Sequence, residues 1–69
     1  MNYSSKYLIK LLKKNGFVFS RSNGSHHLYI NPVSGKRTTV PVHGKKDLPK
    51  GTFYAILKQS GIEEEGYHR

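Results

Sequence analysis

Two adjacent histidines follow a glycine in the segment Gly24-Ser25-His26-His27. Imidazole is the side chain best suited to move protons at neutral pH, because its unperturbed pKa is about 6.5. Beside a glycine, backbone amides can also approach an anion closely. One histidine could therefore act as general base or acid on an RNA 2′-hydroxyl, which then attacks the adjacent phosphate. Plain contact with phosphate or base is the alternative, which the local sequence favours because most histidines are not catalytic, and both interpretations stay open here.

The sequence contains few residues that could support other catalytic mechanisms. A paired-carboxylate mechanism needs two acids at one site, but the acids are Asp47 and the run Glu63-Glu64-Glu65, which is typical of a solvated helix end or tail. No serine lies in a nucleophile elbow. The absence of cysteine excludes thiolate nucleophiles, disulfides and iron–sulfur clusters.

A zinc site would have to draw on the four histidines. These are His26, His27, His43 and His68. Adjacent residues of a strand point to opposite faces, and no cysteine or carboxylate completes the set. We therefore expect neither a metal nor a cofactor.

Basic residues recur beside glycines. The segments are Gly35-Lys36-Arg37, Gly44-Lys45-Lys46 and Lys50-Gly51-Thr52. Such cations neutralise phosphates, and the amides at a helix start favour phosphate as well. A solvated loop explains any single lysine equally well, whereas the set favours phosphate contact. The predicted RNA-binding residues are Ser25, His27, Lys36, Arg37, His43, Lys45, Lys46 and Lys50.

The charge balance points to a polyanionic partner. The chain has 69 residues, a formal net charge of +8 and a sequence pI of about 10.0. Over residues 1–62 eleven basic residues face one acid, a balance of +10, and residues 63–69 contribute the remaining −2. Nucleic acid is the usual cellular polyanion that such a body attracts. A basic surface that docks an acidic protein is the alternative.

The length predicts a single domain over residues 1–69. Residues 1–16 carry scattered lysines and no uninterrupted apolar run, so they fit neither a signal peptide nor a membrane span. Together with the lack of cysteine, this predicts a cytoplasmic protein without membrane contact.

Periodicity and turn residues divide the chain into five elements. Helices are predicted within 4–16 and 48–61, and strands within 17–22, 26–32 and 36–43. Asn23-Gly24 and Ser34-Gly35 predict turns, and Pro41 predicts that the third strand is an edge or ends nearby. The order predicts an α+β fold in which both helices cover one face of a three-stranded antiparallel sheet. A double-stranded-RNA-binding domain has this element order.

Strand alternation predicts which side chains share a face. His26 should lie with Leu28 and Ile30, and we expect this apolar set on the core side. His26 would then be partly sheltered at the rim of the core, unless a bulge beside the preceding glycine turn re-aims it. The open face would belong to His27 or Tyr29, together with Thr39 and His43 of the next strand.

A series of short motifs runs in order along nearly the whole chain. They are Leu11-Leu12-Lys13-Lys14-Asn15-Gly16-Phe17, Gly24-Ser25-His26, Val40-Pro41-Val42-His43-Gly44, Leu48-Pro49-Lys50-Gly51-Thr52, Ile56-Leu57-Lys58 and Gly61-Ile62. No single motif is diagnostic, but their order and spacing are specific. In this series the chain resembles the HicA family of bacterial toxins, small mRNA interferases of type II toxin–antitoxin systems.

The resemblance implies a fold like that of a double-stranded-RNA-binding domain and a catalytic histidine at His26. Whether His27 or His43 assists stays open. It also implies a cognate HicB-type antitoxin, which binds the toxin, blocks its RNA site and commonly represses the operon, so that operator DNA is met only through the complex. The expected activity is metal-independent cleavage of mRNA; a non-catalytic RNA-binding module is the alternative.

Overall fold

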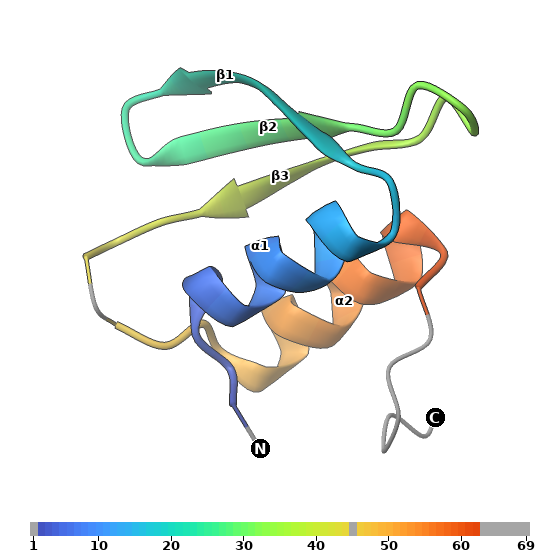
Figure 1. Ribbon diagram of the computed structural model, residues 1–69. Coiled ribbons are helices and arrows are strands. Elements are labelled where there is room, and N and C mark those ends of the chain that lie inside the picture. The colour runs from blue at the N-terminus through green and yellow to red at the C-terminus, as the bar shows by residue number, and fades with distance from the viewer. Residues whose placement is uncertain (1, 45, 63–69) are drawn as a thin grey trace.

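The computed structural model describes residues 2–44 and 46–62. The elements are α1 (Ser5–Lys14), β1 (Val18–Asn23), β2 (His26–Ile30), β3 (Arg37–Pro41) and α2 (Lys50–Ser60) (Figure 1). Both helices lie on one side of the sheet, and in the described part of the chain no helix covers the other side. The predicted α+β architecture, like that of a double-stranded-RNA-binding domain, is confirmed.

Helix α1 lies within the predicted range 4–16, and Ser4 caps its start. The Tyr7 amide donates to Ser4 Oγ at 3.1 Å, which satisfies one of the free donors of the first turn. Leu8 and Leu12, one turn apart, are fully buried. After the helix the chain turns at Gly16, whose φ of +91° is readily adopted only by glycine.

The sheet has the strand order β1-β2-β3, and both pairings are antiparallel. Gly24, with φ +61°, forms the turn of the first hairpin. Strand β3 is an edge and ends at Pro41, as expected of a residue without an N–H to donate. Just beyond it the Val42 amide donates to the Ser25 carbonyl at 2.7 Å, which ties the end of β3 to the hairpin turn.

Strand β1 contains an irregularity that the sequence did not predict. Phe19 pairs with Tyr29, but Arg21 pairs with Leu28, so the register shifts and Ser20 is the extra residue of a β-bulge. A bulge bends its strand and changes the face to which the following side chains point. The bulge lies in β1, not in β2 beside the glycine turn.

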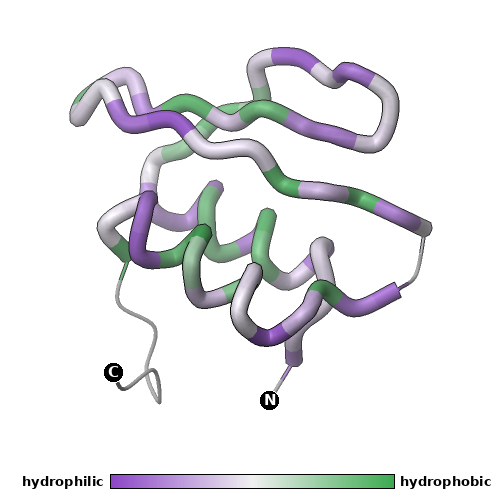
Figure 2. The backbone as a smooth tube through the Cα atoms, turned by 180° about the vertical axis from the view of Figure 1, so that it is seen from behind, coloured by the Kyte–Doolittle hydropathy of each residue, from purple (hydrophilic) through white to green (hydrophobic). Residues whose placement is uncertain are grey.

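The core lies between the sheet and the two helices. Four α2 residues at helical spacing are buried: Phe53, Ile56, Leu57 and Ser60. The Ser60 hydroxyl donates to the Ile56 carbonyl at 2.7 Å, so this buried polar group is satisfied. Figure 2 shows hydrophobic stretches on both helices and on the strands. The buried apolar residues are Leu8, Leu12, Phe17, Tyr29, Val40, Leu48, Phe53, Ile56, Leu57 and Ile62.

No helix within residues 2–44 and 46–62 is long and apolar enough to cross a membrane. The acidic run Glu63-Glu64-Glu65, predicted to be a solvated helix end or tail, lies outside the described residues. The assignment of residues 1–69 to one domain stays a prediction.

Candidate active site

Alternation along β2 places its two histidines in different environments. His27 pairs with Val40, and Tyr29 pairs with Thr38; both β3 partners are buried on the helix side of the sheet. His26 lies on the opposite, uncovered side and is exposed. The expected assignment of faces was therefore wrong, because it is His26 and not His27 that faces outward with Thr39.

The error arose because Leu28 and Ile30 are more hydrophobic than their neighbours in β2. Tyr29 is nevertheless the residue that fills the core, with 4% of its surface exposed, and Leu28 and Ile30 are only half-buried. An aromatic ring buries a large area, and Tyr29 also packs edge-on against Phe19 with ring centroids 5.7 Å apart. This burial raises the pKa of the Tyr29 hydroxyl.

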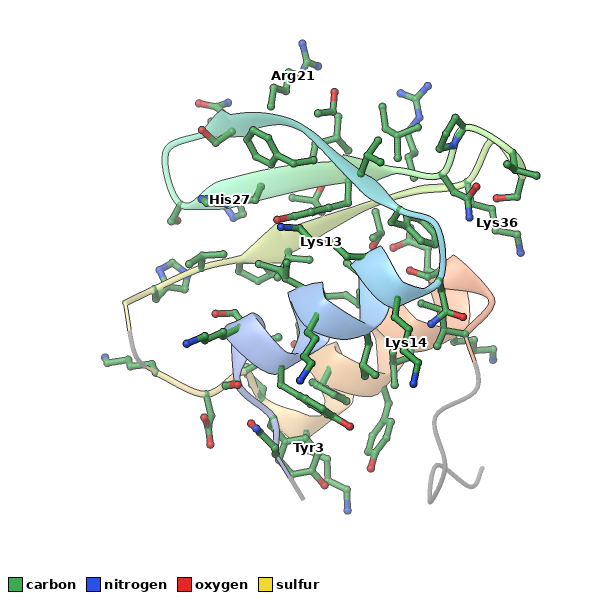
Figure 3. The ribbon with its side chains drawn as sticks, in the orientation of Figure 1. Tyr3, Lys13, Lys14, Arg21, His27 and Lys36 are labelled. Atoms are coloured by element: carbon green, nitrogen blue, oxygen red, sulfur yellow. The ribbon has the colours of Figure 1, made fainter. Side chains whose placement is uncertain are left out.

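The uncovered side carries three cross-strand rows of residues, and we call this surface the open face. The rows are Asn23, His26 and Pro41; Arg21, Leu28 and Thr39; and Val18, Ile30 and Arg37. Successive rows are about 7 Å apart, because same-face residues are separated by two positions of a strand. Figure 3 shows the Arg21 side chain pointing away from the helices.

A hollow of about 620 Å³ lies on the open face. Its lining includes Arg21, His26, Leu28, Arg37 and Thr39. The volume falls in the range typical of small-molecule sites. Of the predicted residues, the hollow brings together His26 and Arg37, and it adds an apolar floor and a second arginine.

Two further hollows continue from the first around the β3 edge. The second, of about 520 Å³, shares His26 and Thr39 with the first and reaches α2 at Thr52 and Gln59. The third, of about 470 Å³, shares Pro41 and Thr52 with the second. His26 thus lies where the first two hollows meet, and one imidazole is accessible from both.

The side chain of His26 has no hydrogen-bond partner in the described part of the chain. Both ring nitrogens are therefore available. His27 differs, because it is half-buried and its ring lies edge-on to Phe19 with centroids 5.8 Å apart. The two imidazoles therefore lie in different environments, one exposed on the open face and one packed against an aromatic ring.

The predicted phosphate contacts are spread over the molecule. Arg37 lies in the first hollow, whereas His43 and Lys46 line the third. Asp47, the one acid of residues 1–62, also lines the third hollow, where its carboxylate would repel a phosphate. Lys50 is exposed at the first residue of α2. Arg37 is the predicted cation that the structure places in the same hollow as His26.

Lys36 lies at the other end of the sheet. A Cβ atom added to Gly61 would come within 2.9 Å of Lys36 Nζ, so this ammonium lies over the carboxyl end of α2, where the helix dipole favours a cation. In Figure 3 Lys36 and His27 mark opposite ends of the sheet. Ser25 is half-buried in the hairpin turn, and Lys45 lies outside the described residues. Their RNA contacts stay predictions.

Sequence reasoning missed Arg21 altogether. Arg21 follows an aromatic, β-branched stretch and has no glycine beside it, whereas the predicted cations lie in segments that contain a glycine. Its side chain reaches the open face because of the bulge at Ser20, and no glycine or proline within residues 18–22 marks that bulge in the sequence. The useful signal lies in the pairing of β1 with β2, which a sequence pattern does not contain.

The described residues offer no group of three or more His, Cys, Asp or Glu side chains that could hold a metal ion. His68, part of the zinc alternative, lies outside them.

Fold and charge define the class: a small, strongly basic α+β domain like the double-stranded-RNA-binding domain, with an accessible histidine on its open sheet face. A model of the HicA toxin of bacterial toxin–antitoxin systems matches residues 5–62. The chain belongs to this HicA toxin family.

Two relatives show the extent of the similarity. The chain is 36% identical over 53 residues to "Probable mRNA interferase HicA" of Pseudomonas fluorescens (strain Pf0-1), an alignment that covers 77% of this chain and 85% of the relative. It is 40% identical over 52 residues to "Probable mRNA interferase HicA 2" of Photorhabdus laumondii subsp. laumondii, covering 75% of this chain and 84% of that protein.

Proposed function

We propose that this toxin is a metal-independent endoribonuclease that cleaves mRNA with His26 as its catalytic histidine. The observation that carries the proposal is the position of His26, exposed and without a hydrogen-bond partner among the described residues, where two hollows of a basic surface meet. The names of both relatives, mRNA interferases, support the same activity. Such a substrate would be met in the cytoplasm.

The reaction needs only the RNA and a proton carrier. The 2′-oxygen forms a bond to phosphorus while the bond from phosphorus to the 5′-oxygen breaks. As a base, His26 takes the 2′-hydroxyl proton, and water supplies a proton to the leaving 5′-oxygen; as an acid, His26 protonates the leaving oxygen, and water takes the 2′ proton. Both routes leave a 2′,3′-cyclic phosphate and a 5′-hydroxyl. Single-stranded or unpaired RNA is the preferred substrate, because its bases can be splayed out and read.

The test is cleavage of a defined RNA by the purified chain, freed of antitoxin, in EDTA. His26→Ala should lose at least about 10²-fold in rate, the usual contribution of a general acid or base. His27→Ala is the matched control: it removes the adjacent imidazole and should still cut. Products should carry 2′,3′-cyclic phosphate ends.

Equal cleavage by all three proteins would contradict the role of His26, and linear 3′-hydroxyl ends would contradict the mechanism. If no form cuts but all bind RNA, the chain is a non-catalytic RNA-binding module instead. Circular dichroism must show that each variant is folded, and the exposure of His26 makes that the expected result.

We also propose that the antitoxin of this system is of the HicB type and covers the site. The +10 balance of residues 1–62 attracts an acidic protein for the same reason that it attracts RNA, so inhibitor and substrate compete for one surface. Adding a HicB-type protein encoded beside the toxin gene should stop cleavage. Operator DNA should bind the complex and not the toxin alone. Inhibition that leaves RNA binding unchanged would contradict the competition.

A further inference from the structure

The bulge in β1 determines where the Arg21 side chain points. Phe19 pairs with buried Tyr29 and so lies on the helix side of the sheet. In a regular strand the residue two positions later returns to the same side, which would direct Arg21 toward the helices. The extra residue, Ser20, cancels this, and Arg21 pairs with Leu28 on the open face. Bulges are common next to active sites, where they re-aim a side chain.

Two arginines lie on the open face, and Arg21 is the closer of them to the row that contains His26. Its row adjoins the row of His26 at about 7 Å, whereas Arg37 lies two rows away at about 14 Å. Arg21 and His26 also line the same hollow, and Arg21 is exposed. Leu28, between Arg21 and Thr39, gives that hollow an apolar floor, which strengthens charge interactions above it.

The proposed cleavage creates a charge that His26 alone does not neutralise. As the 2′-oxygen attacks, negative charge builds on the phosphoryl oxygens while a histidine is occupied with the proton. A guanidinium suits this task, because it remains charged and donates two parallel hydrogen bonds to a phosphate.

We propose that Arg21 binds the scissile phosphate and stabilises the charge that develops on it during cleavage. This inference rests on the proposed function and assigns a second residue to the same site. The β-bulge would then contribute to catalysis, because it brings the guanidinium to the face where His26 lies.

The test compares Arg21→Ala with Lys14→Ala in RNA cleavage by the antitoxin-free chain. Each variant removes one exposed cation, but Lys14 lies in the helix layer, away from the open face (Figure 3). Arg21→Ala should lower kcat by about 10²-fold, as loss of one transition-state donor does. Lys14→Ala should stay within about twofold of the unmodified chain, as expected of a surface change away from the site.

Two further variants separate catalysis from a structural role. Arg21→Lys keeps the positive charge, so it should recover part of the kcat that Arg21→Ala loses. The kcat would not depend on this charge if the arginine had a merely structural role. Combined with His26→Ala, Arg21→Ala should cause little additional loss, because residues that act in one step are not additive. Circular dichroism and urea unfolding should be unchanged for all of these exposed-site variants.

The outcomes keep the two proposals distinct. If the unmodified chain cuts RNA and Arg21→Ala behaves like Lys14→Ala, the role of Arg21 is overturned while the proposed function stands. If Arg21→Ala raises KM alone and leaves kcat unchanged, Arg21 holds RNA but does not stabilise the transition state, which also overturns the inference. If the unmodified chain cuts no RNA, the proposed function fails and the role of Arg21 fails with it.

Discussion

The two faces of β2 differ in exposure and packing, although their residues alternate along a strand of only five residues. On the open face His26 is exposed, lacks a hydrogen-bond partner among the described residues and shares a hollow with two arginines. On the helix side His27 lies against Phe19, and Tyr29 is part of the core. One strand therefore supplies both the exposed surface that carries His26 and part of the core beneath it. Substitutions on the two faces should therefore affect different measurements.

The largest effect on stability should come from Tyr29→Ala. Tyr29 is 4% exposed and packed in the core, so truncation should cost about 3–5 kcal/mol of unfolding free energy, as for other buried aromatic residues. Urea unfolding measures this cost, and the neighbouring Leu28→Ala is the control. Leu28 is half-buried on the open face, and its truncation should cost about 1 kcal/mol. Equal costs for the two variants would contradict the division of β2 into two faces.

The same contrast extends to β3, where two threonines are adjacent. Thr38 is 2% exposed, and its hydroxyl donates to Gln59 Oε1 at 2.7 Å. Thr38→Val should therefore cost about 1 kcal/mol of unfolding free energy, the usual net value of a hydrogen bond. Thr39→Val changes the exposed face and should stay within about 0.5 kcal/mol. A larger loss for Thr39→Val would show that the faces of β3 are reversed.

His27→Ala should have a smaller effect, and on stability alone. It removes an edge-on contact with Phe19 from a half-buried position, which should cost about 0.5 kcal/mol. The kcat for RNA cleavage should stay within about twofold of the unmodified chain, because the ring lies on the other side of the sheet from His26. A loss of kcat comparable with that of His26→Ala would assign chemistry to His27 and break the comparison.

The smallest effect should appear at alkaline pH. Burial raises the pKa of Tyr29 in the folded chain above the value of about 10 that tyrosine has when unfolded. The neutral hydroxyl therefore stabilises the fold fully below about pH 10, and this contribution is lost as the pH rises through the folded pKa. Urea unfolding at about pH 8 and pH 10.5 should show the decrease, and Tyr29→Phe should reduce it. An identical decrease in both proteins would mean that Tyr29 is not responsible.

Most of the fold was predictable because its signals are local. The Gly24 turn and the end of β3 at Pro41 each depend on the chemistry of one residue and its immediate neighbours. The inward face of α2 was predictable as well, since residues Phe53 to Ser60 repeat at helical spacing. Local signals of this kind do not depend on how distant segments pair.

The candidate site was predictable only in part. The pair His26-His27 was singled out by residue type and the nearby glycine, and His26 was chosen by the resemblance to the HicA family, but its face was assigned wrongly and Arg21 was missed. Both errors have a non-local cause. The buried side of β2 follows from its register with Val40 of β3, and the direction of Arg21 follows from one extra residue in β1. Hydropathy along a single strand contains neither piece of information.

The junction of hollows at His26 also bears on the mechanics of the polymer that would lie there. A strand that fills both hollows leaves the sheet surface, passes over the β3 edge and continues toward α2, so it must bend at the imidazole. A nucleic-acid duplex resists such a bend, since its persistence length is about 50 nm for DNA, whereas an unpaired strand is much more flexible. In-line attack also requires the entering and leaving oxygens to lie on opposite sides of phosphorus. The shape of the surface would thus select substrates by bending stiffness before any base is read.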